Sequence, residues 1–198
     1  RPRQITCPPL TVSIDSPNTF DAFPLGQISR ATAFWVAFGV SIYEWNETTD
    51  AFADTADDLT LAPTTKPVSF NGKLWIANGT SFDDYDGATV TNHADFAAQA
   101  FCVWDRRMFG LATNGQLWET FDGTTWTNIG AEAKINDGSL MRHIVAFYDR
   151  SDFPMPVVIT DQDVWAFDPS GPALYRTDVQ YPGHRDQGLG SAVWRGEL

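Results

Sequence analysis

Short apolar runs alternate with polar, Gly-containing turns along most of this chain. Residues 74–77 and 108–112 are apolar runs, and each is followed at once or within two residues by an Asn-Gly pair. Runs this short do not make helices, and Asn-Gly favours a tight type I′ hairpin turn. Residues 117–121 then form an alternating segment that ends at a second turn, Asp122-Gly123. The pattern predicts three strands joined by two hairpins, with a fourth strand from the preceding segment, such as residues 67–70.

The same unit recurs at a regular spacing. Residues 78–92 align without a gap with residues 114–128, and nine of the fifteen positions are identical or exchange one aromatic residue for another. Looser copies begin at Gly39 and Asp161, so the spacings between copies are 39, 36 and 47 residues. Repeats of this length are typical of propeller blades. We therefore predict an all-β fold, a β-propeller of four-stranded antiparallel blades.

The repeat also predicts the domain boundaries. A Pro-rich extended arm is expected over residues 1–27, followed by a partial propeller over residues 28–198. The blades are expected at about residues 28–62, 63–97, 98–132 and 133–180, with the start of a next blade at residues 188–198. Residues 194–198 repeat the phrase that opens the unit at residue 70, so we expect about four blades plus the start of a fifth. The alternative is that residues 1–27 and 181–198 together complete a fifth blade.

Two segments fit the strand pattern less well. Residues 92–99 are the least β-like part of the repeats, and a turn or two of helix between blades is expected there. Arg106 and Arg107 stand where an earlier copy has Gly72 and Lys73, and both arginines are expected to be solvated.

All eight tryptophans lie inside the repeated units. One interpretation is a set of stacking platforms for sugars. The other is that these side chains fill the space between neighbouring twisted blades. Equivalent positions in successive repeats favour packing, because a binding platform would gather on one set of loops. The tryptophans are Trp35, Trp45, Trp75, Trp104, Trp118, Trp126, Trp165 and Trp194.

The chain is strongly acidic, with a net charge of −12. It has twenty Asp and five Glu against three Lys and ten Arg. Contact with nucleic-acid phosphates needs clustered basic residues, so no direct nucleic-acid binding is expected. No apolar stretch approaches the eighteen residues of a membrane-spanning helix, so no membrane span is expected.

The search for chemistry predicts no catalytic residue, no metal site and no cofactor, and it leaves any binding residues unknown. His93, His143 and His184 lie in different units, and none is near a nucleophile motif. The acidic runs at residues 54–58 and 83–87 lack the ligand spacing of an EF-hand and are expected to be exposed loop carboxylates.

Three further features bear on chemistry or on the state of the cysteines. A propeller glycosidase needs carboxylates that converge on the central channel, and Asp105 and Asp149 are candidates, although turn capping explains them more simply. Residues 120–126 are one residue too short for the Asp-box of sialidases. Cys7 and Cys102 show no metal spacing, and two free thiols are expected rather than a disulfide.

The phrases at residues 70–90 and 104–126 resemble those of tail-associated β-propeller proteins of tailed bacteriophages, including the nozzle-type proteins of short-tailed phages. The resemblance covers about residues 28–198. It implies a structural component of a virion tail or tail tip, with other tail proteins and copies of itself as partners in a symmetric assembly. An acidic lumen or outer surface would then not hold passing DNA. The alternatives are a carbohydrate-binding propeller, which could be extracellular, and a propeller glycoside hydrolase.

Overall fold

The computed structural model describes residues 22–28, 33–132, 140–148, 154–168, 170–171 and 173–180. These residues form four antiparallel sheets of four strands each, and no helix occurs among them. The first sheet contains β1 (Ala22–Gly26), β2 (Trp35–Phe38), β3 (Ser41–Asn46) and β4 (Ala51–Asp58). The second contains β5 (Val68–Phe70), β6 (Lys73–Ala77), β7 (Phe82–Tyr85) and β8 (Val90–His93).

The third and fourth sheets repeat this plan. The third contains β9 (Ala98–Trp104), β10 (Arg107–Ala112), β11 (Gln116–Thr120) and β12 (Thr127–Glu132). The fourth contains β13 (Met141–Tyr148), β14 (Pro154–Thr160), β15 (Asp163–Asp168) and β16 (Ala173–Gln180). In every sheet the strands pair in chain order. The predicted all-β fold with four-stranded antiparallel blades is confirmed.

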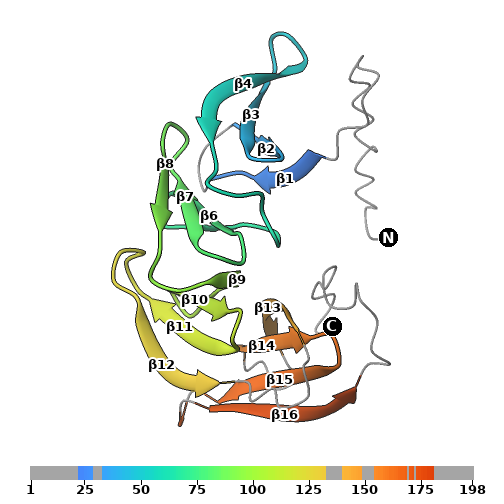
Figure 1. Ribbon diagram of the computed structural model, residues 1–198, viewed down its shortest axis with the longest axis vertical. Coiled ribbons are helices and arrows are strands. Elements are labelled where there is room, and N and C mark those ends of the chain that lie inside the picture. The colour runs from blue at the N-terminus through green and yellow to red at the C-terminus, as the bar shows by residue number, and fades with distance from the viewer. Residues whose placement is uncertain are drawn as a thin grey trace, which may run out of the picture.

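The four sheets follow one another along an arc (Figure 1). The first strands of the sheets lie toward the inside of the arc, and β4, β8, β12 and β16 lie on its outside. Contacts between sheets run from each blade to the next: β1 touches β6, β5 and β6 touch β9, and β9 and β10 touch β13.

The hydrophobic core lies between consecutive blades. The first and second blades enclose a cluster around Trp35 and Tyr85, whose rings meet edge to face with centroids 5.7 Å apart. The second and third blades enclose an aromatic cluster around Trp75, and the third and fourth enclose one around Phe109. Since both faces of an inner blade are covered in this way, its strands carry apolar residues on both faces. This explains the continuous apolar runs in the sequence.

Type I′ turns were predicted at the Asn-Gly pairs 78–79 and 114–115, but the structure has them one hairpin earlier in these blades. In the β5–β6 turn, Asn71 and Gly72 have φ of 49° and 77°, and Asp105 and Arg106 of the β9–β10 turn have φ of 47° and 62°. Of the pair 78–79, only Gly79 has positive φ, at 80°. Asn78 instead caps a four-residue loop, because its Oδ1 accepts hydrogen bonds from the N–H groups of Thr80 and Ser81 at 3.0 and 2.7 Å.

Other expectations also differ from the structure. The first sheet begins at Ala22, within the range expected for the extended arm. The helical turn expected over residues 92–99 is wrong, because β8 ends at His93 and β9 begins at Ala98. Phe96, in the short connection, is only 8% exposed and packs into the cluster around Trp75, so tertiary packing overrides any local helix preference. Residues 1–21 and 181–198 lie outside the described residues, so the end-of-chain repeat is not tested.

Candidate functional site

Each blade closes its outer hairpin with an Asn or Asp side chain that caps the turn. Asp86 Oδ1 accepts hydrogen bonds from the N–H groups of Ala88 and Thr89, both at 2.9 Å. Asp122 Oδ1 does the same for Thr124 and Thr125, at 2.7 and 2.8 Å. The equivalent residues of the first and fourth blades are Asn46 and Asp168.

These caps also affect acid strength. The backbone N–H groups of Thr125 and Thr124 hold the pKa of Asp122 well below its usual range. The hydroxyl of Ser170, and after it the backbone N–H of the same residue, donates a hydrogen bond to Asp168 and lowers its pKa. Both carboxylates stay ionised near neutral pH and are bound to their own turns, so neither is suited to act as a general acid.

The expectation that residues 83–87 carry exposed loop carboxylates is wrong for Asp83 and Asp84. Both lie on β7 and are buried, with exposed fractions of 0% and 1%. Asp83 accepts hydrogen bonds from the backbone N–H and hydroxyl of Thr60, at 2.9 and 2.8 Å, and from Asn92 Nδ2 at 2.8 Å. Thr60 belongs to the connection between the first two blades, so Asp83 fastens that connection to the second sheet.

Asp84 is held on the opposite face of the same strand. Lys73 Nζ lies 2.8 Å from its Oδ1, and His93 Nε2 lies 2.7 Å from its Oδ2. The His93 ring stacks on Phe82 with centroids 5.0 Å apart. An Asp-His pair can support catalysis, but here a lysine shares the carboxylate and an aromatic ring covers the imidazole. The arrangement is a packed ion-pair network.

The expectation that Arg107 is solvated is also wrong. Its Nη1 lies 2.6 Å from Glu119 Oε2, and its guanidinium carbon lies 5.1 Å from the centroids of Trp104 and Phe109. A planar guanidinium suits such a sandwich because it stacks on rings while it hydrogen-bonds a carboxylate. Its neighbour Arg106 is exposed, as expected.

The tryptophans in the described part of the chain are used mainly for packing. Trp75 is 1% exposed, and its indole N–H donates to the carbonyl of Phe70 at 3.1 Å. Trp118 and Trp165 are half-buried and pack against the two clusters that join the third blade to its neighbours. Trp118 also stacks on Phe96 with an interplanar angle of 7°. These positions support the packing interpretation over a set of equivalent sugar platforms.

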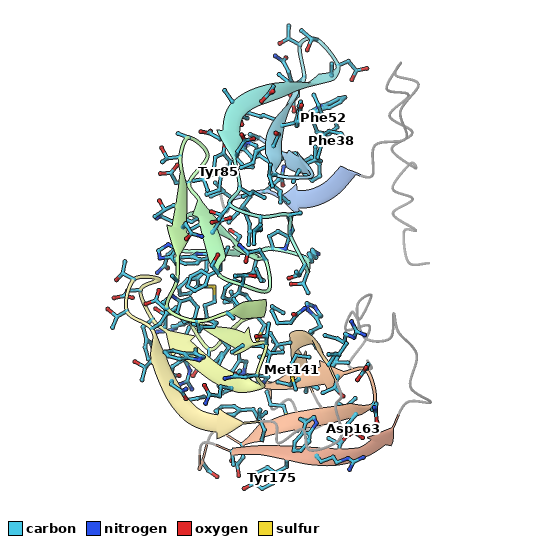
Figure 2. All side chains as sticks on the ribbon, viewed as in Figure 1. Phe38, Phe52, Tyr85, Met141, Asp163 and Tyr175 are labelled. Carbon is cyan, nitrogen blue, oxygen red and sulfur yellow. The ribbon has the colours of Figure 1, made fainter. Side chains whose placement is uncertain are left out.

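An outer acidic pocket of about 610 Å³ lies between the first blade and the β7–β8 hairpin. Its acidic lining residues are Glu44, Glu47, Asp54 and Asp57. Trp45 and Tyr85 supply aromatic walls, and Figure 2 shows Tyr85 at the junction of the first two sheets. Burial is the main reason why the pKa of Tyr85 is raised to about 12, and the negative charge of Asp57 adds to the rise. The pocket thus combines carboxylates with ring faces, which favours a positively charged group.

A second cavity, of about 570 Å³, lies where the inner strands of the four blades approach one another. We call it the axial cavity. The residues that line it come from each blade or from the segment just before it. From the first strand of the first blade to that of the fourth, they are Leu25, Gly26, Gln27, Lys66, Pro67, Val68, Ser69, Leu74, Phe101, Cys102, Val103, His143, Ile144, Val145 and Ala146.

The candidate residues from the sequence do not gather in one site. Asp105 is exposed in the β9–β10 turn and does not line the axial cavity. Cys102 is a free thiol on its wall, 5% exposed, and burial raises its pKa. His143 also lines the cavity. Cys7, Asp149 and His184 lie outside the described residues.

Sequence reasoning missed Lys66. This lysine precedes the second blade, and it lines the same cavity as His143 only because the blades follow one another along an arc (Figure 1). No local pattern around either residue indicates the other. Within the residues that the structure describes, no group of three or more His, Cys, Asp or Glu is placed to hold a metal ion. In that same part of the chain, no helix is long and apolar enough to cross a membrane.

Comparison with known proteins yields matches among solved structures alone. No family model matches the chain, and no curated protein does. A catalytically inactive variant of virginiamycin B lyase from Staphylococcus aureus, in a structure with quinupristin, matches with a TM-score of 0.60 and 12% identity, covering 84% of this chain and 59% of that one. Regucalcin from Agrobacterium tumefaciens, titled a calcium-binding protein, matches with a TM-score of 0.54 and 16% identity, covering 80% of this chain and 60% of that one.

The N-terminal domain of Nup159 gives a similar result, with a TM-score of 0.51 and 11% identity, covering 74% of this chain and 46% of that one. This chain therefore spans about three fifths or less of the length of these structures. At identities this low the likeness concerns the fold, and it confirms the predicted β-propeller. Propellers carry many unrelated functions, so the fold does not transfer an activity.

Proposed function

We propose that the chain is a structural component of a bacteriophage tail or tail tip, in which the propeller is a scaffold for protein–protein assembly. One observation carries the proposal: the polar residues of the repeats are used to build and join blades. Asp86 and Asp122 cap hairpins, while Asp83 fastens the connection between the first two blades. Repetition of packing and capping residues is what a scaffold requires.

The phage assignment rests on the repeat phrases at residues 70–90 and 104–126. The charge distribution is compatible with it. Asp54, Asp57 and Asp58 lie on β4, an outer strand of the first blade. The described lining of the axial cavity carries no carboxylate. An acidic surface repels DNA, so the outer faces of such blades could border a DNA path without holding it.

The expected partners are other tail proteins and further copies of the chain. The outer acidic pocket supports this expectation, because Glu44, Asp54 and Trp45 line it together. A basic side chain of a neighbour would meet both carboxylates and an aromatic face there. Such a contact steers association and is weakened by salt.

The test is whether the chain is present in virions. Particles of the phage that encodes it would be purified and analysed by mass spectrometry, and the tail would be labelled with gold-conjugated antibodies against the chain. We expect peptides from the chain in purified particles and gold at the tail. Peptides absent from intact particles, although present in the infected cell, would contradict a virion role. Specific binding on a glycan panel would favour the carbohydrate-binding alternative.

A further inference from the structure

The axial cavity differs in charge from the rest of the molecule. The chain has 25 acidic residues against 13 lysines and arginines. None of those acidic residues is among the described residues that line the cavity, and Lys66 is the one lysine or arginine there. Its side chain is exposed, so the ammonium group lies where the cavity meets solvent. The electrostatic preference of this cavity is therefore for an anion.

His143 adds a buried polar atom without a partner. Its Nδ1 is covered by neighbouring atoms and makes no hydrogen bond, so this nitrogen reaches the cavity only when the imidazole turns about its Cβ–Cγ bond. The pairing of β13 with β14 is irregular between Met141 and His143, and bulges of this kind often redirect a side chain next to a binding site. Burial, assisted by the charge of Lys66, lowers the pKa of His143, so the ring is neutral near pH 7. A neutral imidazole with its proton on Nδ1 donates one hydrogen bond.

The remaining walls are mostly apolar. Leu25, Leu74, Phe101 and Ile144 come from all four blades. A volume of about 570 Å³ is in the range of small-molecule sites, which combine apolar walls with a few polar groups that fix orientation. A ligand that satisfies this lining has an apolar body and one anionic head.

We propose that the axial cavity binds a small organic carboxylate. Its apolar part packs among Leu25, Leu74 and Phe101, and its carboxylate accepts a hydrogen bond from Lys66 Nζ. Once the imidazole of His143 turns toward the cavity, the carboxylate also accepts a hydrogen bond from Nδ1, which has no partner without the ligand. The proposal goes beyond the scaffold role and does not depend on it. A tail protein or a protein of another kind could carry the same site.

The first experiment uses the unmodified chain and two probes of nearly equal shape, phenylacetate and phenylacetamide. Isothermal titration calorimetry would measure the affinity of each, and inorganic phosphate would test the anion site without an apolar body. Because the carboxylate makes charge-assisted hydrogen bonds, phenylacetate is expected to bind at least about tenfold more tightly than the amide. Equal affinities of the two probes, or no binding of either, would overturn the proposal.

The second experiment locates the site. Lys66→Gln and His143→Gln are each expected to weaken phenylacetate binding by about tenfold. Arg106→Gln is the matched control, because it removes the same charge from an exposed turn outside the cavity. NMR of the ¹⁵N-labelled His143 ring is expected to show a change at Nδ1 when phenylacetate is added. Loss of affinity in the Arg106 variant equal to that in the Lys66 variant would show that net charge, rather than the cavity, controls binding.

Discussion

Gly123 lies against Trp75 across the second and third blades, and this contact allows a quantitative test of inter-blade packing. A methyl group added at Gly123 would lie 2.6 Å from Cζ2 and 3.2 Å from Cη2 of Trp75. Trp75 is not free to move, because its N–H is bonded to Phe70 and its ring meets Trp126 edge to face at 6.0 Å. Gly123→Ala should therefore force the two blades apart or distort the indole.

The cost of Gly123→Ala has two parts. Gly123 has φ of +81°, a conformation that costs an alanine about 1–2 kcal/mol. Overpacking against Trp75 adds about 1–3 kcal/mol. Gly130 offers a matched control, because its φ is +75° and nothing lies within 4 Å of an added methyl group. Gly130→Ala should thus lose only the stability that the backbone conformation costs an alanine. The difference in stability between the two variants then isolates the contact with Trp75.

Equilibrium unfolding in urea, followed by tryptophan fluorescence and circular dichroism, would measure both variants. We expect Gly123→Ala to lose about 2–5 kcal/mol and Gly130→Ala about 1–2 kcal/mol of the free energy of unfolding. Similar slopes against urea concentration are needed for this comparison, because a changed slope indicates a change in the folded or unfolded ensemble. If the two variants lose the same stability, the indole yields at no cost and the reasoning is refuted.

Three further predictions concern single side chains. Arg106→Gly should stabilise the protein by about 0.5–1 kcal/mol in thermal unfolding, because glycine accepts the positive φ of that turn; a destabilised variant would contradict this. Asp84→Asn should cost about 1–3 kcal/mol, because it weakens a buried acceptor of Lys73, whereas Asp95→Asn, at an exposed carboxylate, should change little; equal losses would count against the buried network. The pKa of His143 is lowered below its unfolded value of about 6.5, so the free energy of unfolding should fall as the pH drops below about 6.5. His143→Gln should make this free energy less dependent on pH between about pH 7 and 5. An unchanged pH dependence in the variant would exclude this histidine as its source.

The repeat could be read from sequence because blade strands are local structures. Residues 78–92 and 114–128 share turn residues as well as apolar positions, and both signals arise from neighbours in the chain. The burial of Asp83 and Asp84 could not be predicted in the same way. Successive residues of a strand face opposite sides, and an acidic pair is normally assigned to solvent. In this propeller both faces of β7 are covered, and the partners Thr60, Lys73 and His93 were not identifiable from spacing.

The axial cavity illustrates a different limit. Lys66 lies just before the second blade and His143 lies in the fourth, so their place on one cavity depends on the rotation between successive sheets. Sequence periodicity gives the number of residues in a blade and does not give that rotation. The structure was therefore needed to show that Lys66 and the half-buried His143 line the same cavity.

The pairing of strands in chain order has a consequence for biosynthesis. Each sheet uses one continuous stretch of chain, so its backbone hydrogen bonds can form as soon as that stretch leaves the ribosome. Side-chain burial comes later, because Trp75 is covered by residues such as Phe101 and Trp126 that are translated after it. During synthesis the newest blade therefore has its strands paired while one aromatic face awaits a sheet that is still being made. Chaperones that bind exposed aromatic surface would meet the nascent chain at that face.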